Sequence, residues 1–439
     1  MNLVQITPGA GGMYCGNCFR DNALVAALRR QGHDALMVPL YLPMTLDEAS
    51  TRGDTPTFFG GINVYLSQQS AAYRRAPAWL RRWFDAPALL RWAAGKAAKT
   101  RAADVGALNL SMLRGESGNQ ARELEDLVAW LKNLPKPDAV FLSNALLVGF
   151  ARRLREALGT RVVVFLQSEE AFLDAIPEPW GSRSWLTLAE RARDVDGWIA
   201  PSRFFADRMG ARLGLPPDRV RVVPNGINLE GYDVLPPRPP LVPGGPVTLG
   251  FFARQCHDKG LDLVVDAFVA LRRGGAFPNL RLRVGGGCGP TDEPFVAEQK
   301  SKLAKAGLAD AAAFHPNLSR QEKILFYAAC DVLSVPARPG EAFGLYVIES
   351  LAAGTPLVQP TFGTFPELLE ATGGGVLCGA HDPEAIAGAL RPLLEHPERL
   401  RELGEAGRRA VFDRYTDDAM ARGVLAALAT LPANAGRRA

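Results

Sequence analysis

The chain has 439 residues, 47% hydrophobic and 22% charged, with a net charge of +4, and this length allows two or three globular domains. Its 44 glycines and 33 prolines are spread along the chain, which excludes a collagen-like or wholly disordered protein. No apolar run reaches the roughly 18 residues of a membrane-spanning helix, and the N-terminus lacks a basic stretch followed by an apolar one. We therefore expect a cytoplasmic protein without a signal peptide.

The N-terminal part alternates strands and helices in a way typical of a parallel sheet. Asn2–Thr7 is predicted to form a strand, and after a glycine-rich turn a helix through residues 23–28 ends at Gly32. The pattern then predicts strands at Ala35–Leu40, Ala139–Leu142, Val162–Leu166 and Gly197–Ala200, most of them followed by a helical stretch.

Between Met44 and Leu134 the alternation breaks, and we interpret this part as a mostly helical insertion. Within it, Ala71–Arg101 carries eight basic residues against the single acid Asp85, so the positive net charge of the chain comes from this segment. A basic character confined to one segment argues against nucleic-acid binding. Two interpretations of the segment stay open. It is either a peripheral contact with the inner face of an anionic membrane or an ordinary insertion with buried tryptophans.

A proline-rich stretch over residues 235–246 is the clearest linker, because proline denies backbone donors to a sheet and stiffens the chain. The alternation restarts after it, with strands predicted at Val247–Phe252, Leu280–Gly285, Val332–Val335 and Leu357–Gln359. Two helix starts carry capping signals, which are Ser319 with Glu322 and Asp382 followed by Pro383.

These patterns predict an α/β protein with two doubly wound, Rossmann-like domains. We place the first domain at residues 1–234 with the insertion at about 44–134, the hinge at 235–246, and the second domain at 247–412. A C-terminal helix within residues 413–439 follows, and its return to the first domain is left open.

The strongest chemical signal is PARPGEAFGLYVIE over residues 336–349, followed by AAGTP over residues 352–356. It predicts a strand, a loop that contains Glu341, and a helix that begins near Leu345. Gly344 permits close approach of the backbone, and the free N–H groups of such a helix start bind phosphate. Glu349 is then placed to accept hydrogen bonds from ribose hydroxyls, and Glu341 is placed beside a hydroxyl-bearing ring beyond the phosphates.

Glu341-x7-Glu349, with Phe343-Gly344 inside it, resembles the signature of glycosyltransferase family 4, a retaining family with the GT-B fold. Two weaker patterns support the resemblance. Arg254-x4-Lys259-Gly260 resembles an element of the family's donor domain, and Gly11-Gly12 with the later Gly32-His33 resembles its N-terminal glycine loop and turn.

The resemblance implies two domains that face a central cleft, and transfer of a hexose from a nucleoside-diphosphate sugar to an unidentified acceptor with retention and without a metal ion. Nearby cations lower the barrier to departure of the diphosphate. The implied catalytic residues are Glu341, Lys259 and Arg254. The implied donor-binding residues are Gly11, Gly12, Arg254, Lys259, Glu341, Phe343, Gly344, Leu345 and Glu349. No cofactor is expected, and no oligomeric state is predicted.

One position departs from the family pattern. Gln167 follows the strand Val162–Leu166 where the family usually has a histidine, and a glutamine cannot relay a proton at ordinary pH. The acceptor-side candidates are therefore Gln167, Glu169 and Glu170. The alternative is that no residue takes over the polar role of the histidine.

Two short motifs have plainer interpretations than the chemistry they suggest. Cys15-x-x-Cys18 has no second pair, so we interpret it as small residues at a helix start, with redox sensitivity as the alternative. Asp194-x-Asp196 spells a metal-binding motif of another glycosyltransferase fold, but its place before an apolar strand favours capping.

Other functions remain as alternatives. A dinucleotide-dependent oxidoreductase is disfavoured, because the third glycine of its fingerprint falls at Tyr14 and no acid ends the next strand. A non-catalytic GT-B protein that binds a nucleotide sugar or serves as a scaffold is a second alternative, and a GT-B epimerase or phosphorylase is a third. Turnover of a sugar nucleotide separates the enzymes from the binding protein.

Overall fold

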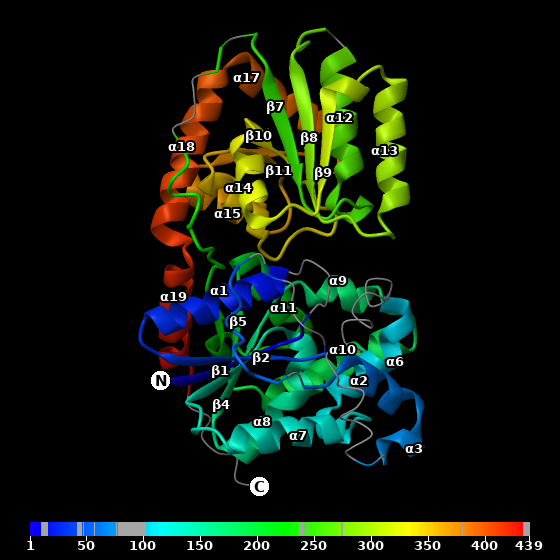
Figure 1. Ribbon diagram of the computed structural model, residues 1–439, viewed down its shortest axis with the longest axis vertical. Coiled ribbons are helices and arrows are strands. Elements are labelled where there is room, and N and C mark those ends of the chain that lie inside the picture. Colours follow the sequence, from blue (N-terminus) through cyan, green and yellow to red (C-terminus); the bar gives the residue numbers. More distant parts are fainter. Residues whose placement is uncertain are drawn as a thin grey trace. The chain divides into compact units, whose positions relative to one another are not determined.

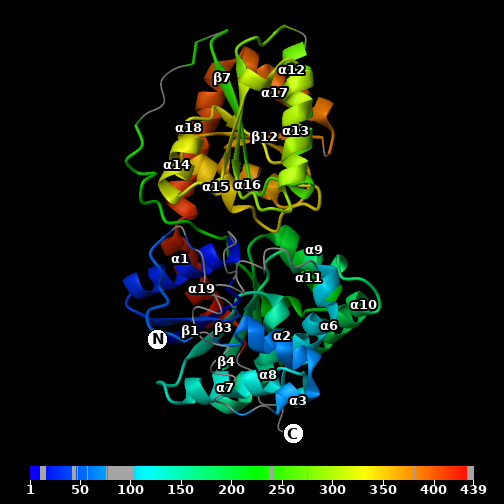
Figure 2. The same ribbon diagram turned by 45° about the vertical axis from the view of Figure 1, so that its right-hand side comes forward.

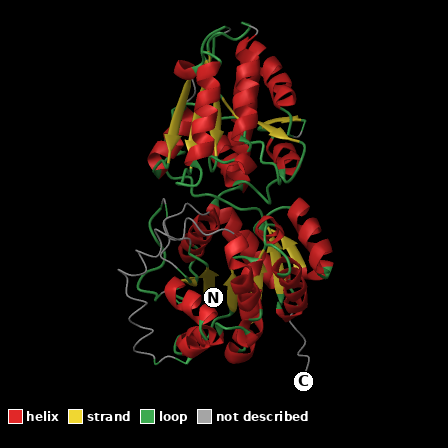
Figure 3. Ribbon diagram, turned by 90° about the vertical axis from the view of Figure 1, so that its right-hand side faces the viewer, coloured by secondary structure: helices red, strands yellow, loops and turns green. Residues whose placement is uncertain are grey.

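The computed structural model describes residues 1–9, 16–41, 46, 48–56, 58–75, 77, 102–236, 241–242, 244–273, 275–379 and 381–432. The chain forms two compact units. The N-terminal unit is Met1–Pro224 with Met420–Ala439, and the C-terminal unit is Asn225–Ala419. Each unit contains a six-stranded parallel sheet with helices packed on it (Figure 1, Figure 3).

The sheet of the N-terminal unit has the strand order β2-β1-β3-β4-β5-β6. Its strands are β1 (Asn2–Thr7), β2 (Asp34–Pro39), β3 (Ala139–Leu142), β4 (Arg161–Phe165), β5 (Gly197–Ala200) and β6 (Val220–Val222). Every residue of β3 and β5 is buried, which explains why these strands are continuous apolar runs. The order reverses between β1 and β3, and ligands of such sheets bind at the carboxyl ends of the strands beside a reversal.

Helices of the N-terminal unit surround this sheet. They are α1 (Gly16–Arg30), α8 (Ala151–Leu158), α9 (Glu169–Asp174), α10 (Trp180–Arg191) and α11 (Arg203–Leu213), with 3-10 turns η2 (Ala145–Phe150), η3 (Ala192–Asp194) and η4 (Pro217–Arg219). The start of α11 is fixed by Ser202, whose hydroxyl accepts a hydrogen bond of 3.1 Å from the N–H of Phe205.

From Gly61 onward the described residues of the predicted insertion are mostly helical, whereas residues 48–56 and 58–60 form bends and turns. The helical elements are α2 (Gly61–Gln69), α3 (Ala71–Arg74), α6 (Ala102–Leu113), η1 (Gly115–Ser117) and α7 (Ala121–Lys132). A hydrogen bond of 2.9 Å from Ser67 to Glu123 joins α2 to α7. Most of the basic segment, residues 76 and 78–101, lies outside the described residues. Among the helices that the structure describes, none combines the length and hydropathy needed to cross a lipid bilayer.

The last helix, α19 (Asp417–Thr430), packs mainly in the N-terminal unit. Its buried apolar face joins a core made by β1, β4 and α1, to which it contributes Met420, Ala421, Val424, Ala427 and Leu428, with Leu431 just after the helix. The stretch from Met420 to Leu431 is therefore part of the hydrophobic core of the first unit.

The sheet of the C-terminal unit has the strand order β12-β11-β10-β7-β8-β9. Its strands are β7 (Val247–Phe252), β8 (Leu280–Gly286), β9 (Ala312–Pro316), β10 (Val332–Leu333), β11 (Leu357–Pro360) and β12 (Gly375–Cys378). This order reverses between β7 and β10, which are hydrogen-bonded neighbours. The predicted strands are present, whereas β6, β9 and β12, each at the end of a sheet, were not predicted.

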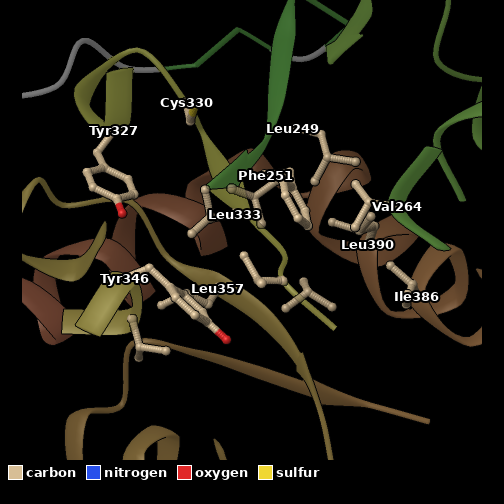
Figure 4. Close-up of a cluster of buried hydrophobic side chains, with 14 of the residues drawn as sticks. Leu249, Phe251, Val264, Tyr327, Cys330, Leu333, Tyr346, Leu357, Ile386 and Leu390 are labelled. Atoms are coloured by element: carbon tan, nitrogen blue, oxygen red, sulfur yellow. The ribbon is translucent and has the colours of Figure 1, made fainter. Parts of the chain in front are cut away.

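Helices on the C-terminal sheet complete its core. They are α12 (Leu261–Arg273), α13 (Glu293–Lys305), α14 (Arg320–Ala328), α15 (Leu345–Ala352), α16 (Phe365–Thr372), α17 (Pro383–Glu395) and α18 (Pro397–Arg414), with turns η5 (His257–Lys259) and η6 (Ala309–Ala311). Leu249 and Phe251 of β7 pack against Val264 of α12 and Leu390 of α17 (Figure 4; Figure 2 shows these helices). Both predicted caps are present, since Ser319 and Glu322 form a capping box and Asp382 accepts a hydrogen bond from the N–H of Glu384.

The division between the units falls after Pro224, earlier than the predicted boundary at residue 234. The reason is a backbone pairing within the C-terminal unit. The N–H of Ile227 donates to the carbonyl of Tyr415, and the N–H of Asp417 donates to that of Ile227, each over 2.9 Å. This unit also extends to Ala419, beyond the predicted residue 412. Of the predicted hinge, residues 237–240 and 243 lie outside the described residues.

The packing of α19 generates a prediction of stability. Leu428 is 1% exposed, so Leu428→Ala removes buried methyl groups and is expected to lower the free energy of unfolding by about 2–5 kcal/mol. The matched control is Leu186→Ala on α10, where the leucine is 64% exposed and a change within about 0.5 kcal/mol is expected. Urea unfolding measures both values, and equal effects would contradict the packing of α19.

Candidate functional site

Loops that follow β7, β8 and β10 carry candidate site residues of the C-terminal unit. They contain residues 253–260, 287–292 and 334–344. Because all strands are parallel, these loops lie at one edge of the sheet, on either side of the strand-order reversal. The predicted residues Arg254, Lys259 and Glu341 all lie on them.

Lys259 and Glu341 form an ion pair across the reversal. Nζ of Lys259 lies 2.5 Å from Oε1 of Glu341, and the two side chains are 30% and 10% exposed. Burial lowers the pKa of Lys259, but the charge of Glu341 and the hydrogen bond to it outweigh burial, so the pKa is raised overall. The hydroxyl of Tyr346 donates to the same Glu341 oxygen over 3.2 Å. The carboxylate is thus held by one donor from the turn after β7 and one from the first turn of α15.

Further contacts hold the loop after β7 against the loop after β10. The guanidinium of Arg338 makes a bidentate pair with Asp262 at 3.0 and 2.7 Å. The backbone N–H of Arg338 donates to the backbone carbonyl of Asp258. Gly260 has a φ of +76°, and a Cβ atom there would lie 2.4 Å from the carbonyl oxygen of Pro336. Only glycine allows the Lys259 turn to approach the Glu341 loop this closely.

The start of α15 is shaped for an anion. Gly344 precedes the helix with a φ of +80°, and no side chain caps the helix start. The first N–H groups of an α-helix have no acceptor within the helix, so those of α15 are available to a ligand at the end of the loop that carries Glu341. Leu345 is half-buried at the first helical position. Phe343, predicted to bind the donor, lies 3% exposed in the hydrophobic core, so its backbone rather than its ring is available there.

Glu349 lies in α15 and is paired on both carboxylate oxygens. Nζ of Lys323 lies 2.7 Å from Oε1, and the hydroxyl of Tyr327 donates to Oε2 over 2.9 Å. Both partners come from α14, which packs beside α15. The sequence analysis singled out Glu349 but neither of these partners.

Arg254 forms an ion pair with Asp292, a residue that the sequence analysis did not single out. Its guanidinium contacts the carboxylate of Asp292 at 2.9–3.1 Å, and that bond raises the pKa of Arg254. Its side chain remains 59% exposed, so it is still open to a ligand. The contacts of Arg254 therefore run to the β8 loop rather than to Glu341.

The loop after β8 was also missed. The run Gly285-Gly286-Gly287-Cys288-Gly289 spans the end of β8 and the start of this loop, and it was a usable signal. Asn317, after β9, binds both the N–H and the carbonyl of Cys288, at 3.0 and 2.9 Å. Asn317 therefore fixes the course of this glycine-rich loop.

In the N-terminal unit, Gly11, Gly12 and Cys15 lie outside the described residues. Next to this gap, Thr7 at the end of β1 donates a hydrogen bond to Asp21, and Arg20 pairs with Asp21 at 2.9 Å. Burial raises the pKa of Asp21, and the charge of Arg20 opposes this effect. Cys18, in the first turns of α1, is fully buried.

Of the three acceptor-side candidates, Glu169 has a position that indicates a structural role. One carboxylate oxygen accepts from the N–H of Ala145 and the other from the N–H of Gln167, each over 2.8 Å. It thereby joins the loops after β3 and β4. Burial raises the pKa of Glu169 to about 7, although both hydrogen bonds lower it. Glu170 is also buried, 3.8 Å from Arg208, and Gln167 is half-buried.

The Asp194-x-Asp196 motif has structural partners. Asp194 pairs with Arg152 at 3.0 Å and with Arg191 at 3.4 Å, and Asp196 accepts a hydrogen bond from the N–H of Val162. Among the described residues, no three His, Cys, Asp or Glu side chains are grouped as metal ligands.

Comparisons with known proteins agree with this organisation. The chain matches the model of "Glycosyltransferase Family 4" over residues 93–230 and that of "Glycosyl transferases group 1" over residues 237–410. It is 32% identical to the D-inositol 3-phosphate glycosyltransferase of Xylanimonas cellulosilytica over 57% of this chain and 60% of that protein, thus less than two thirds of its length. It is 30% identical to the lipopolysaccharide core mannosyltransferase LpsB of Rhizobium meliloti over 56% of this chain and 71% of that protein.

Solved structures show the same fold. The crystal structure of Anabaena HepE in complex with UDP superposes with a TM-score of 0.67, covering 98% of this chain and 100% of HepE at 14% identity. The likeness confirms the expected GT-B fold with two doubly wound α/β units.

The buried carboxyl of Glu169 generates a pH prediction. Its folded pKa of about 7 lies above its ordinary value of 4.5, so the folded state binds an extra proton between these values. The free energy of unfolding is therefore expected to fall by about 3 kcal/mol as the pH rises from 4.5 to about 7, and to stay level at higher pH.

Glu169→Gln tests this expectation, because the amide does not titrate. The variant loses one backbone hydrogen bond, which lowers the free energy of unfolding by about 1–3 kcal/mol at pH 5. The difference from the unsubstituted protein is expected to shrink or reverse by pH 8 in urea unfolding curves. A difference that stays constant from pH 4.5 to pH 8 would contradict the raised pKa.

Proposed function

The chain belongs to glycosyltransferase family 4, and we propose that it is a retaining hexosyltransferase that uses a nucleoside-diphosphate sugar and needs no metal ion. The observation that carries this proposal is the Lys259–Glu341 ion pair at the strand-order reversal, beside the uncapped start of α15. A cation, a carboxylate and free N–H groups there match a sugar attached to a diphosphate.

The diphosphate is assigned to the start of α15 and to the ammonium of Lys259. Negative charge grows on the departing phosphate oxygen in the transition state, so fixed donors around it lower the barrier. Arg254 is a second, more exposed cation for this charge, held in place by Asp292. These groups provide the electrostatic stabilisation that a metal ion supplies in other enzymes.

The transfer step balances without a protein nucleophile. The bond between the anomeric carbon and the phosphate oxygen breaks, and its electron pair stays on the diphosphate. The acceptor hydroxyl attacks the same face of the sugar, and its proton passes to the departing phosphate oxygen. Attack and departure on one face retain the anomeric configuration.

Glu341 exchanges one of its two partners during this reaction. When the diphosphate takes over the ammonium of Lys259, the Glu341 carboxylate is released to accept hydrogen bonds from hydroxyls of the donor sugar. Tyr346 keeps one bond to this carboxylate and so preserves its orientation. Glu349, one turn into α15, is assigned to the ribose.

Acceptor recognition is assigned to the N-terminal unit, at the carboxyl ends of its strands. Gln167 follows β4 there and offers an amide for a sugar hydroxyl. Glu169 serves this site by holding the backbone of Gln167 in place. Glu170 remains a candidate for direct contact.

The names of similar proteins support the proposed chemistry. One relative is a glycosyltransferase named for D-inositol 3-phosphate, another is a mannosyltransferase, and the HepE structure contains UDP. These names agree with a nucleotide-sugar donor and leave the base, sugar and acceptor to experiment.

A non-catalytic nucleotide-sugar-binding protein is the second candidate function. The observation that favours it is Gln167 at the position of the usual histidine, because this side chain does not relay a proton. Turnover of a sugar nucleotide by the purified protein decides against it.

Glu341→Gln and Lys259→Ala are each expected to lower the transfer rate by roughly 10²–10³-fold, since each removes one charge from the reacting centre. Both variants are expected to stay folded, and circular dichroism checks this. Glu370→Gln, which changes an exposed acid on α16, is the control and keeps the full rate. Rates near normal in the two site variants would refute the assignment.

Transfer is also expected to continue in excess EDTA, and the product is expected to have the anomeric configuration of the donor in its NMR spectrum. Loss of turnover in EDTA that added Mg²⁺ restores would overturn metal independence. An inverted product would overturn retention.

A further inference from the structure

Lys323 is a buried cation that the reaction described above does not use. It lies in α14 with 7% of its surface exposed, next to the buried residues Ile324, Phe326 and Tyr327. Lysine is rarely this buried unless it is paired. Its position on an apolar helix face therefore needs an explanation.

The partner of Lys323 is Glu349 of the neighbouring helix α15. The ammonium lies 2.7 Å from Oε1, and the Tyr327 hydroxyl holds Oε2 over 2.9 Å. Tyr327 is itself fixed, because its ring lies 4.8 Å from that of Phe252 and its carbonyl accepts a hydrogen bond from Thr355. Burial raises the pKa of Tyr327 well above its ordinary value, so its hydroxyl keeps its proton and donates.

Stability alone does not account for this arrangement. A buried ion pair is often no more stabilising than apolar side chains of the same volume, because both charges lose their water. Removing one partner, however, leaves an uncompensated charge. The pair is therefore better explained by what it does to Glu349 than by what it adds to the fold.

Glu349 can still accept hydrogen bonds in this geometry. An ionised carboxylate has about four acceptor positions, and Lys323 and Tyr327 occupy one on each oxygen. A vicinal diol has two adjacent hydroxyl donors that fit the remaining positions. Glu349 is thus presented as a charged acceptor with a fixed orientation.

We propose that Lys323 is a positioning residue that holds Glu349 as the charged acceptor for the 2′- and 3′-hydroxyls of the donor nucleotide. Lys323 thereby makes the site selective for ribonucleoside over deoxyribonucleoside diphosphates. The inference rests on the proposed function, in which Glu349 faces the ribose. A hydroxyl bonded to a charged acceptor contributes more than one bonded to a neutral acceptor, and its loss leaves that acceptor unpaired.

The test compares dissociation constants for a nucleoside diphosphate and its 2′-deoxy and 3′-deoxy analogues by titration calorimetry, with whichever of UDP, GDP and ADP binds best. The unsubstituted protein is expected to bind the ribonucleotide at least tenfold more tightly than either analogue. In Lys323→Met, which keeps the length and loses the charge, the ribonucleotide is expected to bind at least tenfold more weakly. The analogues change by less than threefold, so discrimination nearly disappears.

Two further variants separate positioning from a general effect on folding. Lys323→Arg keeps the charge and is expected to retain discrimination. Lys302→Met is the matched control, since it removes a lysine that pairs with Asp266 at 2.8 Å on α12 and α13, and discrimination should not change. If Lys323→Met does not fold, the double variant Lys323→Met/Glu349→Gln replaces the ion pair by neutral groups, and it should bind without discrimination.

The outcomes distinguish this inference from the proposed function. Binding by the unsubstituted protein with no preference for the ribonucleotide would overturn the role of Lys323 alone. Full discrimination in Lys323→Met or in the double variant would also overturn the role of Lys323. An equal loss of affinity for all three ligands would overturn it as well. Failure of the unsubstituted protein to bind any nucleoside diphosphate would overturn the proposed function itself.

Discussion

The candidate site depends on one ion pair, between Lys259 after β7 and Glu341 after β10. These two strands are neighbours in the sheet although 82 residues separate the paired side chains in the chain. The reversal of strand order brings the two loops together, and the partly buried pair holds them with opposite charges 2.5 Å apart. Arg338 and Gly260 then restrict the loops to this approach. The β7 and β10 strands that build the core of the C-terminal unit therefore also position the candidate site.

Buried polar groups have a different use in the two units. In the N-terminal unit, the carboxylates of Glu169 and Asp21 are buried. Glu169 joins the loops after β3 and β4, and Asp21 joins α1 to the end of β1. In the C-terminal unit, Glu341 and Glu349 are each held by a lysine and a tyrosine hydroxyl and keep acceptor capacity for a ligand. The same arrangement, a glutamate held by a lysine and a tyrosine, thus occurs twice, once in the loop before α15 and once in α15 itself.

Strands with continuous apolar runs and helices with strong caps were predictable from the sequence, because burial and capping leave local patterns. The edge strands β6, β9 and β12 were missed because they are only partly buried and so lack a continuous apolar run. Glu341 and Lys259 were found through motif spacing. Asp292 and Lys323 were not, because they lie 38 and 26 residues from their partners and nothing local marks them. The burial of the Phe343 side chain in the core was not predicted either, because a motif does not reveal which of its side chains enters the core.

The most direct test of this account is calorimetric titration of UDP, GDP, ADP, dTDP and NAD in excess EDTA into the unsubstituted protein and Lys259→Ala. The account predicts that one nucleoside diphosphate binds the unsubstituted protein without metal, and that the variant binds it at least tenfold more weakly, as expected for the loss of a charged phosphate contact. Binding of NAD alone, or equal affinity in both proteins, would contradict the central place given to the Lys259–Glu341 pair.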